Sequence, residues 1–177
     1  MSISKRRSGA LAATQQTPVD HIGKVFFTLD GSNYVCSGNA IASSNESTVA
    51  TAGHCLNSGP GAFASRFIFV PAYENAAAPF GQCNATELYA PTQWTTRGDI
   101  TYDTGFAIVS SNSGATLSDT VGASGIAVHP LRHDRWGSSG GPWFIGSGSS
   151  DYSNDPNTMF GPYWGSVIAN VYDAAAA

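Results

Sequence analysis

Two short β-rich runs, GKVFFTLD at residues 23–30 and YVCSGNAIAS at residues 34–43, decide the fold class of this chain. The Asp-Gly-Ser-Asn cluster at residues 30–33 stands between them. Each of these residue types favours a turn, because Gly and Asn accept a positive φ and the short polar side chains bond to nearby backbone. Two apolar runs around such a cluster predict a β-hairpin.

Four more runs of the same kind follow the hairpin, with Gly, Asn, Ser and Pro between them. They lie at residues 47–53, 65–73, 85–91 and 103–111. Short β-rich runs at this spacing predict an all-β barrel or sandwich. No internal repeat and no interdomain linker interrupts them.

The tail at residues 163–177, YWGSVIANVYDAAAA, has a different pattern. Its larger apolar residues follow the spacing i, i+3, i+4 and i+7, at Trp164, Val167, Ile168 and Val171. This spacing puts them on one face of a helix. The sequence therefore predicts a C-terminal helix after the strands.

Composition limits the class of protein. A length of 177 residues fits one domain or two small ones, and 42% hydrophobic residues are enough to fill a core. Only 11% of residues are charged, against about 25% in average globular proteins. Ser, Thr, Asn and Gly carry the surface instead, which suits a secreted protein that does not depend on charge for its partners.

Partners and location follow from charge and hydropathy. The net charge is −4 and the only basic run is residues 5–7, which argues against a nucleic-acid partner. No apolar stretch approaches the ~18 residues of a membrane span. The first 20 residues lack the apolar core of a complete signal peptide. The sequons at Asn45 and Asn84 nevertheless fit a secretory protein.

Three residues in chain order fit nucleophilic catalysis by serine. His54 lies in TAGHC after a predicted strand, Asp103 begins the apolar run DTGFAIV, and Ser139 lies in GSSGGP at residues 137–142. Such catalysis needs a base for the hydroxyl proton, an acid that holds the base, and donors for the oxyanion. Asp99, in RGDI, competes with Asp103 for the second role. The position of Asp103 at a strand favours it, and Asp99 is then expected to pair with Arg97 or to cap a turn.

These stretches together resemble the trypsin/chymotrypsin-like serine endopeptidases, closest to the microbial branch related to glutamyl endopeptidases. TAGHC matches the histidine box, YDTGFAIV the aspartate strand and GSSGGP the nucleophile loop, over roughly residues 20–170. The resemblance implies two barrels of six strands each, with the triad in the cleft between them. It implies His54 as base, Asp103 as its partner and Ser139 as nucleophile, with the backbone amides of Gly137 and Ser139 as the oxyanion hole.

The resemblance also implies a Cys36–Cys55 disulfide, which would join the histidine turn to the neighbouring strand. Cys83 has no evident partner. The segment with His129 and His133 lacks an H-E-x-x-H pattern and an evident third ligand, so we expect no metal site there. The expected mechanism uses no cofactor.

The second barrel is expected to be incomplete. Three strands at ~8–12 residues each need ~24–36 residues. The segment available before the nucleophile, residues 123–138, is shorter than that. The expected organisation is an N-terminal extension at residues 1–18, a first barrel with His54 and Asp103 at 19–122, and an abbreviated second barrel with Ser139 and the helix at 123–177. The segment around His133, six residues before the nucleophile, is out of character with the rest.

The predicted function is a secreted, monomeric serine endopeptidase acting on protein or peptide substrates. The alternative is an inactive or truncated homologue that keeps the boxes and acts by binding, which the short second barrel favours. A third interpretation is a non-catalytic β-sandwich binding module. It would require the histidine, aspartate and serine boxes to occur in this order by chance.

Overall fold

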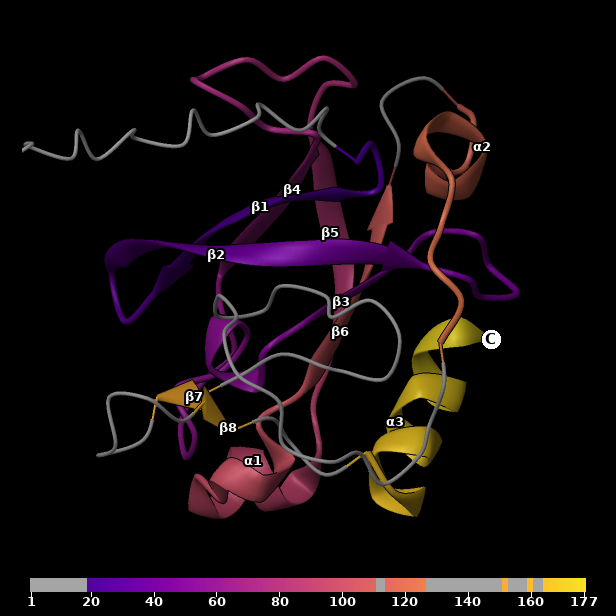
Figure 1. The fold of residues 1–177 in the computed structure, drawn as a ribbon. Helices are drawn as coiled ribbons and strands as arrows, with labels where there is room; N and C mark the ends of the chain where they lie inside the picture. The colour runs from indigo at the N-terminus through magenta and orange to yellow at the C-terminus, as the bar shows by residue number, and fades with distance from the viewer. Residues whose placement is uncertain (1–18, 111–113, 127–150, 153–158, 161–163) are drawn as a thin grey trace, which may run out of the picture.

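The computed structural model describes residues 19–110, 114–126, 151–152, 159–160 and 164–177 (Figure 1). The elements, in chain order, are β1 (Ile22–Leu29), β2 (Ser32–Ile41), β3 (Thr48–Thr51), the 3₁₀ turn η1 (Gly53–Cys55), β4 (Arg66–Pro71), β5 (Cys83–Tyr89), α1 (Thr92–Arg97), the 3₁₀ turn η2 (Ile100–Tyr102), β6 (Gly105–Ser110), α2 (Leu117–Val121), β7 (Asp151–Tyr152), β8 (Met159–Phe160) and α3 (Ser166–Ala176).

Six strands form a closed barrel in the order β1-β2-β3-β6-β5-β4, and every neighbouring pair is antiparallel. The predicted hairpin is confirmed as β1 and β2, which pair from Ile22↔Asn39 to Leu29↔Ser32. Asp30 and Gly31 connect them with φ of 49° and 80°. A two-residue hairpin loop with both φ positive matches the twist of the strands, which explains Asp-Gly at this point.

The barrel interior is apolar because alternate residues of each strand point inward. In β1, Val25, Phe27 and Leu29 are buried and the residues between them are less so. They join Val49 of β3 and Phe69 of β4 in one core cluster. The run that predicted this strand from its residue types is therefore buried on alternate residues.

The predicted C-terminal helix is confirmed as α3, which lies along one side of the barrel (Figure 1). Ile168 and Ala175 are buried against Phe106 of β6, with Trp164 and Val171 packed around them. Val167, expected on this face, is not in the cluster. The helix therefore turns the predicted apolar face toward the barrel, apart from that one residue.

The β2–β3 loop holds the C-terminal end of α3. The side-chain amide of Asn45 donates to the carbonyl of Ala175 at 2.7 Å, and the Thr48 hydroxyl donates to the same oxygen at 3.1 Å. The backbone N–H of Ser44 donates to Ala176 O at 2.9 Å. These donors satisfy carbonyls that the end of a helix leaves without an intrahelical partner.

The fold class is confirmed: the chain is mostly β, with a closed barrel and a C-terminal helix. One closed barrel among the described residues is consistent with an abbreviated second barrel. The short helices α1 and α2 were not expected, since five or six residues carry too little periodicity to be recognised. Among the described residues no helix is long and apolar enough to cross a membrane.

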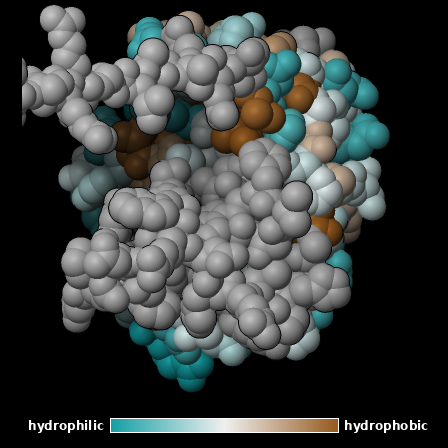
Figure 2. All heavy atoms as spheres, in the orientation of Figure 1, coloured by the Kyte–Doolittle hydropathy of each residue, from teal (hydrophilic) through white to brown (hydrophobic). Residues whose placement is uncertain are grey.

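The described surface is mixed in character. On the face drawn in Figure 2, hydrophilic and pale residues surround a few separate hydrophobic ones. The large hydrophobic side chains that are exposed come from different parts of the described chain: Val19, Tyr34, Val35, Phe63 and Ile100.

Candidate active site

His54 is placed by the turn that follows β3. Its 3₁₀ turn, η1, is closed by the N–H groups of Leu56 and Asn57, which both donate to Gly53 O at 2.9 Å. The His54 side chain is 35% exposed, while Leu56 beside it is fully buried. The turn therefore anchors the chain in the core and leaves the imidazole within reach of solvent.

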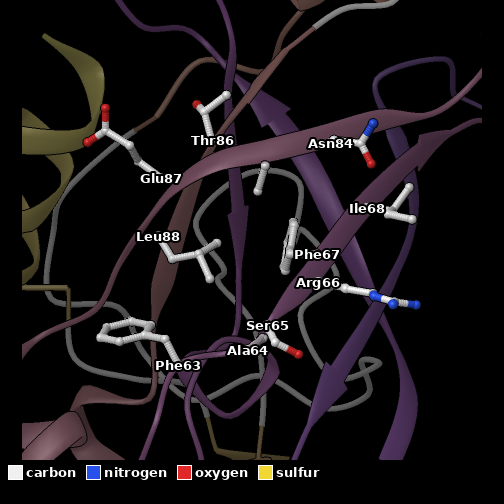
Figure 3. A pocket seen from close by; sticks show the side chains of 11 residues that line it. Phe63, Ala64, Ser65, Arg66, Phe67, Ile68, Asn84, Thr86, Glu87 and Leu88 are labelled. Carbon is white, nitrogen blue, oxygen red and sulfur yellow. The ribbon is translucent and has the colours of Figure 1, made fainter.

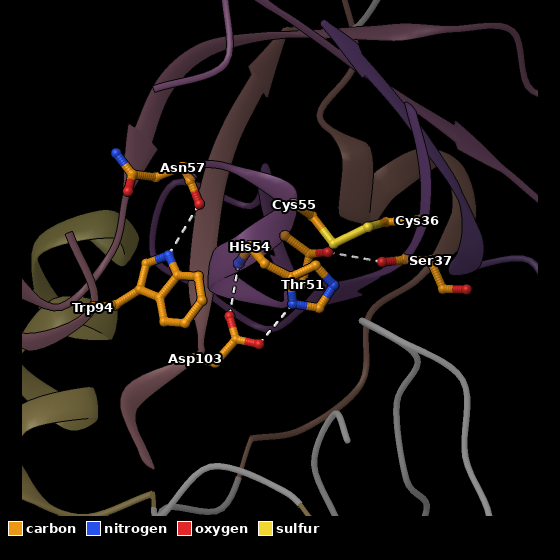
Figure 4. A network of polar contacts seen from close by, with 8 residues as sticks. All are labelled: Cys36, Ser37, Thr51, His54, Cys55, Asn57, Trp94 and Asp103. Atoms are coloured by element: carbon orange, nitrogen blue, oxygen red, sulfur yellow. Dashed lines mark hydrogen bonds and ion pairs between the residues drawn. A yellow bond between two sulfur atoms is a disulfide. The ribbon is translucent and has the colours of Figure 1, made fainter. Parts of the chain in front are cut away.

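His54, just after β3, and Asp103, just before β6, are brought together by the pairing of these two strands, although they are 49 residues apart in sequence (Figure 4). His54 Nδ1 lies 2.6 Å from Asp103 Oδ2, and the backbone N–H of His54 donates to Asp103 Oδ1 at 2.6 Å. An ionised carboxylate only accepts hydrogen bonds, so this contact puts the imidazole proton on Nδ1 and the basic lone pair on Nε2. Two bonds to one carboxylate fix both the turn and the tautomer.

The position of Asp103 distinguishes it from its competitor. Asp103 is 1% exposed and stands between η2 and β6. Asp99 instead caps η2, where its Oδ1 accepts from the backbone N–H of Thr101 at 3.1 Å. The aspartate beside His54 is therefore Asp103, and Asp99 caps a turn as one of its two expected roles.

Trp94 in α1 packs beside the pair, and no local sequence pattern predicts this contact. Trp94 is 8% exposed, and its ring lies edge-on to the His54 ring with 6.5 Å between the centroids. Its Nε1–H donates to Asn57 O at 3.1 Å. A Cβ added to Gly53 would lie 2.8 Å from Asp103 Oδ1 and 3.0 Å from Trp94 Cδ1. The absence of a side chain at Gly53 thus allows the Asp103 carboxylate and the Trp94 indole to pack against the turn.

The disulfide between Cys36 and Cys55 is present, with the two Cα atoms 6.2 Å apart. It joins β2 to the last residue of η1, next to His54 (Figure 4). The Thr51 hydroxyl donates to Ser37 O at 2.8 Å and ties β3 to β2 beside it. The histidine turn is therefore held to the neighbouring strand covalently as well as by hydrogen bonds.

Among the described residues, one group of three potential metal ligands lies close together: Cys36, His54 and Cys55, with ligand atoms within 4.8 Å of one another. The two sulfurs are bonded to each other, so this group does not offer three ligands. Cys83 is a free thiol in the described chain, and it is 5% exposed. Burial raises the pKa of Cys83 above its ordinary value.

Several predicted residues lie outside the described residues. Ser139, Gly137, His129 and His133 are among them. The structure thus describes the base and acid half of the expected triad and its disulfide.

Comparison with known proteins identifies relatives of this barrel and site. The structure of the protease Anisep from Arthrobacter nicotinovorans matches at a TM-score of 0.82 and 44% identity, over 91% of this chain and 97% of that one. The thermostable serine protease AL20 from an extremophilic microorganism matches at 0.81 and 36% identity, over 89% and 97%. No protein-family profile matches the chain.

A curated sequence relative is more distant. The extracellular metalloprotease of Bacillus subtilis (strain 168) is 33% identical over 86 residues, which are 49% of this chain. The match spans 26% of that protein's length.

The six-stranded barrel and the pairing of His54 with the buried Asp103 define a trypsin-like protease fold. The chain belongs to the microbial branch of the trypsin-like serine protease family.

Proposed function

We propose that this chain is a serine endopeptidase that hydrolyses peptide bonds through Ser139, His54 and Asp103. One observation carries the proposal: the buried Asp103 carboxylate accepts from both Nδ1 and the backbone N–H of His54 at 2.6 Å. In serine proteases this arrangement holds the base in the tautomer that accepts the nucleophile's proton and stabilises the imidazolium that forms.

The proposed reaction proceeds in two halves. Ser139 Oγ attacks the scissile carbonyl while His54 Nε2 takes its proton, and the backbone amides of Gly137 and Ser139 bind the oxyanion. His54 then gives the proton to the leaving amine, and an acyl-enzyme remains. Water, activated by His54, hydrolyses the ester and restores the serine. No cofactor takes part in these steps.

We assign residues 19–122 to the barrel unit with the base and acid, and residues 123–177 to the unit with the nucleophile. The elements of the barrel unit support this boundary, because β6 ends at Ser110 and α2 ends at Val121. Ser124 then keeps the following chain on the barrel through backbone hydrogen bonds of 2.9 Å with Ala40 and Ala42. The proposed enzyme is secreted and monomeric and acts on protein or peptide substrates. The Cys36–Cys55 disulfide supports secretion, because disulfides persist in oxidising compartments.

The decisive experiment is fluorophosphonate labelling of the folded chain, read by intact mass. We expect one adduct, absent in Ser139→Ala and His54→Ala and kept in Ser138→Ala, a matched control in the same loop. Labelling that survives Ser139→Ala would overturn the assignment of the nucleophile. A folded chain that never labels would favour the alternative, a homologue that acts by binding.

A further inference from the structure

The barrel wall opens between β4 and β5. These strands pair only at Phe69↔Cys83 and Ile68↔Asn84. The register of β5 against β6 shifts just beyond this point, between Ala85 and Glu87. A bulge bends its strand and increases the local twist, which accounts for β5 leaving β4 after two residue pairs.

A groove of about 540 Å³ occupies this opening, lined by residues 63–68 and 84–88 (Figure 3). If the antiparallel register continued past Ile68↔Asn84, residues 64–67 would face residues 85–88. The groove therefore lies where the missing part of the ladder would be. In the described part of the chain, no strand pairs with these two facing edges.

The groove has an apolar floor and a polar rim. Phe67 is buried in the barrel core, and Ala64, Ala85 and Leu88 pack against the same core cluster. A side chain that enters the groove thus reaches the apolar interior through the wall.

The rim carries hydrogen-bonding groups and balanced charge. Arg66 on the β4 side and Glu87 on the β5 side are both exposed, as are Asn84 and Thr86. The Tyr89 hydroxyl donates to Glu87 Oε2 at 2.5 Å and orients that carboxylate. One cation and one anion favour neither a polyanion nor a polycation, while both suit a neutral polypeptide.

We propose that the β4–β5 groove binds an extended segment of polypeptide, which hydrogen-bonds to a strand edge and inserts an apolar side chain between Phe67 and Leu88. Strand edges recognise extended peptides in this way, with main-chain bonds for affinity and pockets for alternate side chains. The occupant is a segment of the protein substrate, away from the bond that is cut. This last statement rests on the proposed protease function.

One chain segment connects the groove to the candidate active site. Phe63 at the groove forms an antiparallel bridge with Asn57, whose carbonyl accepts from Trp94. The N–H of Ala64 donates to Leu56 O at 2.7 Å. A long substrate could then contact the groove and the candidate active site at the same time. Binding at two connected sites raises the affinity for long substrates and leaves the bond-cleavage step unchanged.

The test measures binding apart from catalysis. The full-length His54→Ala chain is titrated against a fluorescent peptide, acetyl-Glu-Thr-Val-Thr-Lys-amide, and binding is followed by anisotropy. The control peptide carries N-methyl groups on alternate backbone nitrogens. We expect it to bind at least about tenfold more weakly, because the N-methyl groups remove N–H donors that would bond to the strand edge. Amide chemical-shift changes should concentrate at residues 64–67 and 85–88.

A matched pair of charge reversals locates the site. Arg66→Glu on the rim should weaken binding about 2- to 5-fold, the range of an exposed ion pair. Lys24→Glu, exposed on β1 outside the groove, should leave it unchanged. The proposal would be overturned if the two peptides bound equally well, or if the two variants had equal effects. It would also be overturned if sedimentation showed a dimer of the chain that Arg66→Glu dissociates, because a second copy would then occupy the groove.

The two proposals fail separately. If the chain binds the peptide at the groove and never labels with fluorophosphonate, the groove proposal stands and the protease proposal is overturned. If it labels and does not bind the peptide, the protease proposal stands and the groove proposal is overturned. With both intact, Arg66→Glu should raise KM for a protein substrate and leave a short peptide substrate unaffected.

Discussion

The wall formed by β3 and β6 and the wall formed by β4 and β5 belong to one barrel, yet they are built differently. β3 and β6 pair without interruption from Thr48↔Ile108 to Thr51↔Gly105, and η1 follows directly with its disulfide. β4 and β5 separate after two pairs. The continuously paired wall places His54 against Asp103, so the ladder is complete beside the site while the same barrel closes with only two residue pairs elsewhere.

The largest expected effect tests the closed wall directly. Asp103→Asn should keep the fold and reduce kcat/KM on a protein substrate about 10⁴-fold, since an amide NH₂ facing Nδ1 favours the wrong tautomer. Steady-state kinetics measures this, with circular dichroism to check folding. Asp99→Asn, which alters only the cap of η2, is the control and should stay within a few-fold of wild type. Similar losses in both would remove the special role of Asp103.

A pair of leucines compares the two walls in stability. Leu56 is fully buried beside η1, so Leu56→Ala should lower the unfolding free energy by about 2–5 kcal/mol. Leu88, partly buried at the groove, should cost about 1 kcal/mol, because its surroundings are already open. Urea unfolding followed by tryptophan fluorescence gives both values. A larger loss for Leu88→Ala would mean that the open wall is as tightly packed as the closed one.

A pair of glycines sharpens the account of the site. Gly53→Ala forces a Cβ to within 2.8 Å of Asp103 Oδ1, so we expect about 1–3 kcal/mol of destabilisation together with lower kcat. Gly125→Ala meets nothing within 4 Å and should change neither. Thermal unfolding and kinetics on the two variants suffice. If Gly53→Ala behaved like Gly125→Ala, close packing around the carboxylate would not matter.

How far the sequence predicts this molecule depends on the range of the interaction. The strands follow from short β-rich runs between turn residues, α3 follows from the helical spacing of its apolar residues, and the Asp30-Gly31 turn follows from its residue types. The contact of Trp94 with His54 joins segments 40 positions apart, and no local pattern encodes it. The groove depends on a bulge near Ala85, which the run ATELYAP does not reveal. His54 and Asp103 stand out by residue type and by their positions beside strands, and the family resemblance supplies the long-range information that pairs them.

The smallest expected effect concerns Cys83, where β5 still pairs with β4. Burial raises its pKa, so the folded thiol keeps its proton at a pH where the unfolded thiol has lost it. Its contribution to stability is therefore complete at neutral pH and declines above the ordinary thiol pKa. Between pH 7 and 9.5, wild type should lose slightly more unfolding free energy than Cys83→Ala. Rapid alkylation by iodoacetamide without urea would contradict the burial.

The hydrogen bond between Asn45 and Ala175 has a consequence for protein synthesis, because its partners are 130 residues apart in sequence. During synthesis the barrel strands leave the ribosome well before residues 166–176, and contacts at such separation form late. Until then Phe106, three residues after Asp103, lacks its cover of Ile168 and Ala175. In a nascent chain of this design, the surroundings of the candidate site would therefore be completed only after α3 has been synthesised.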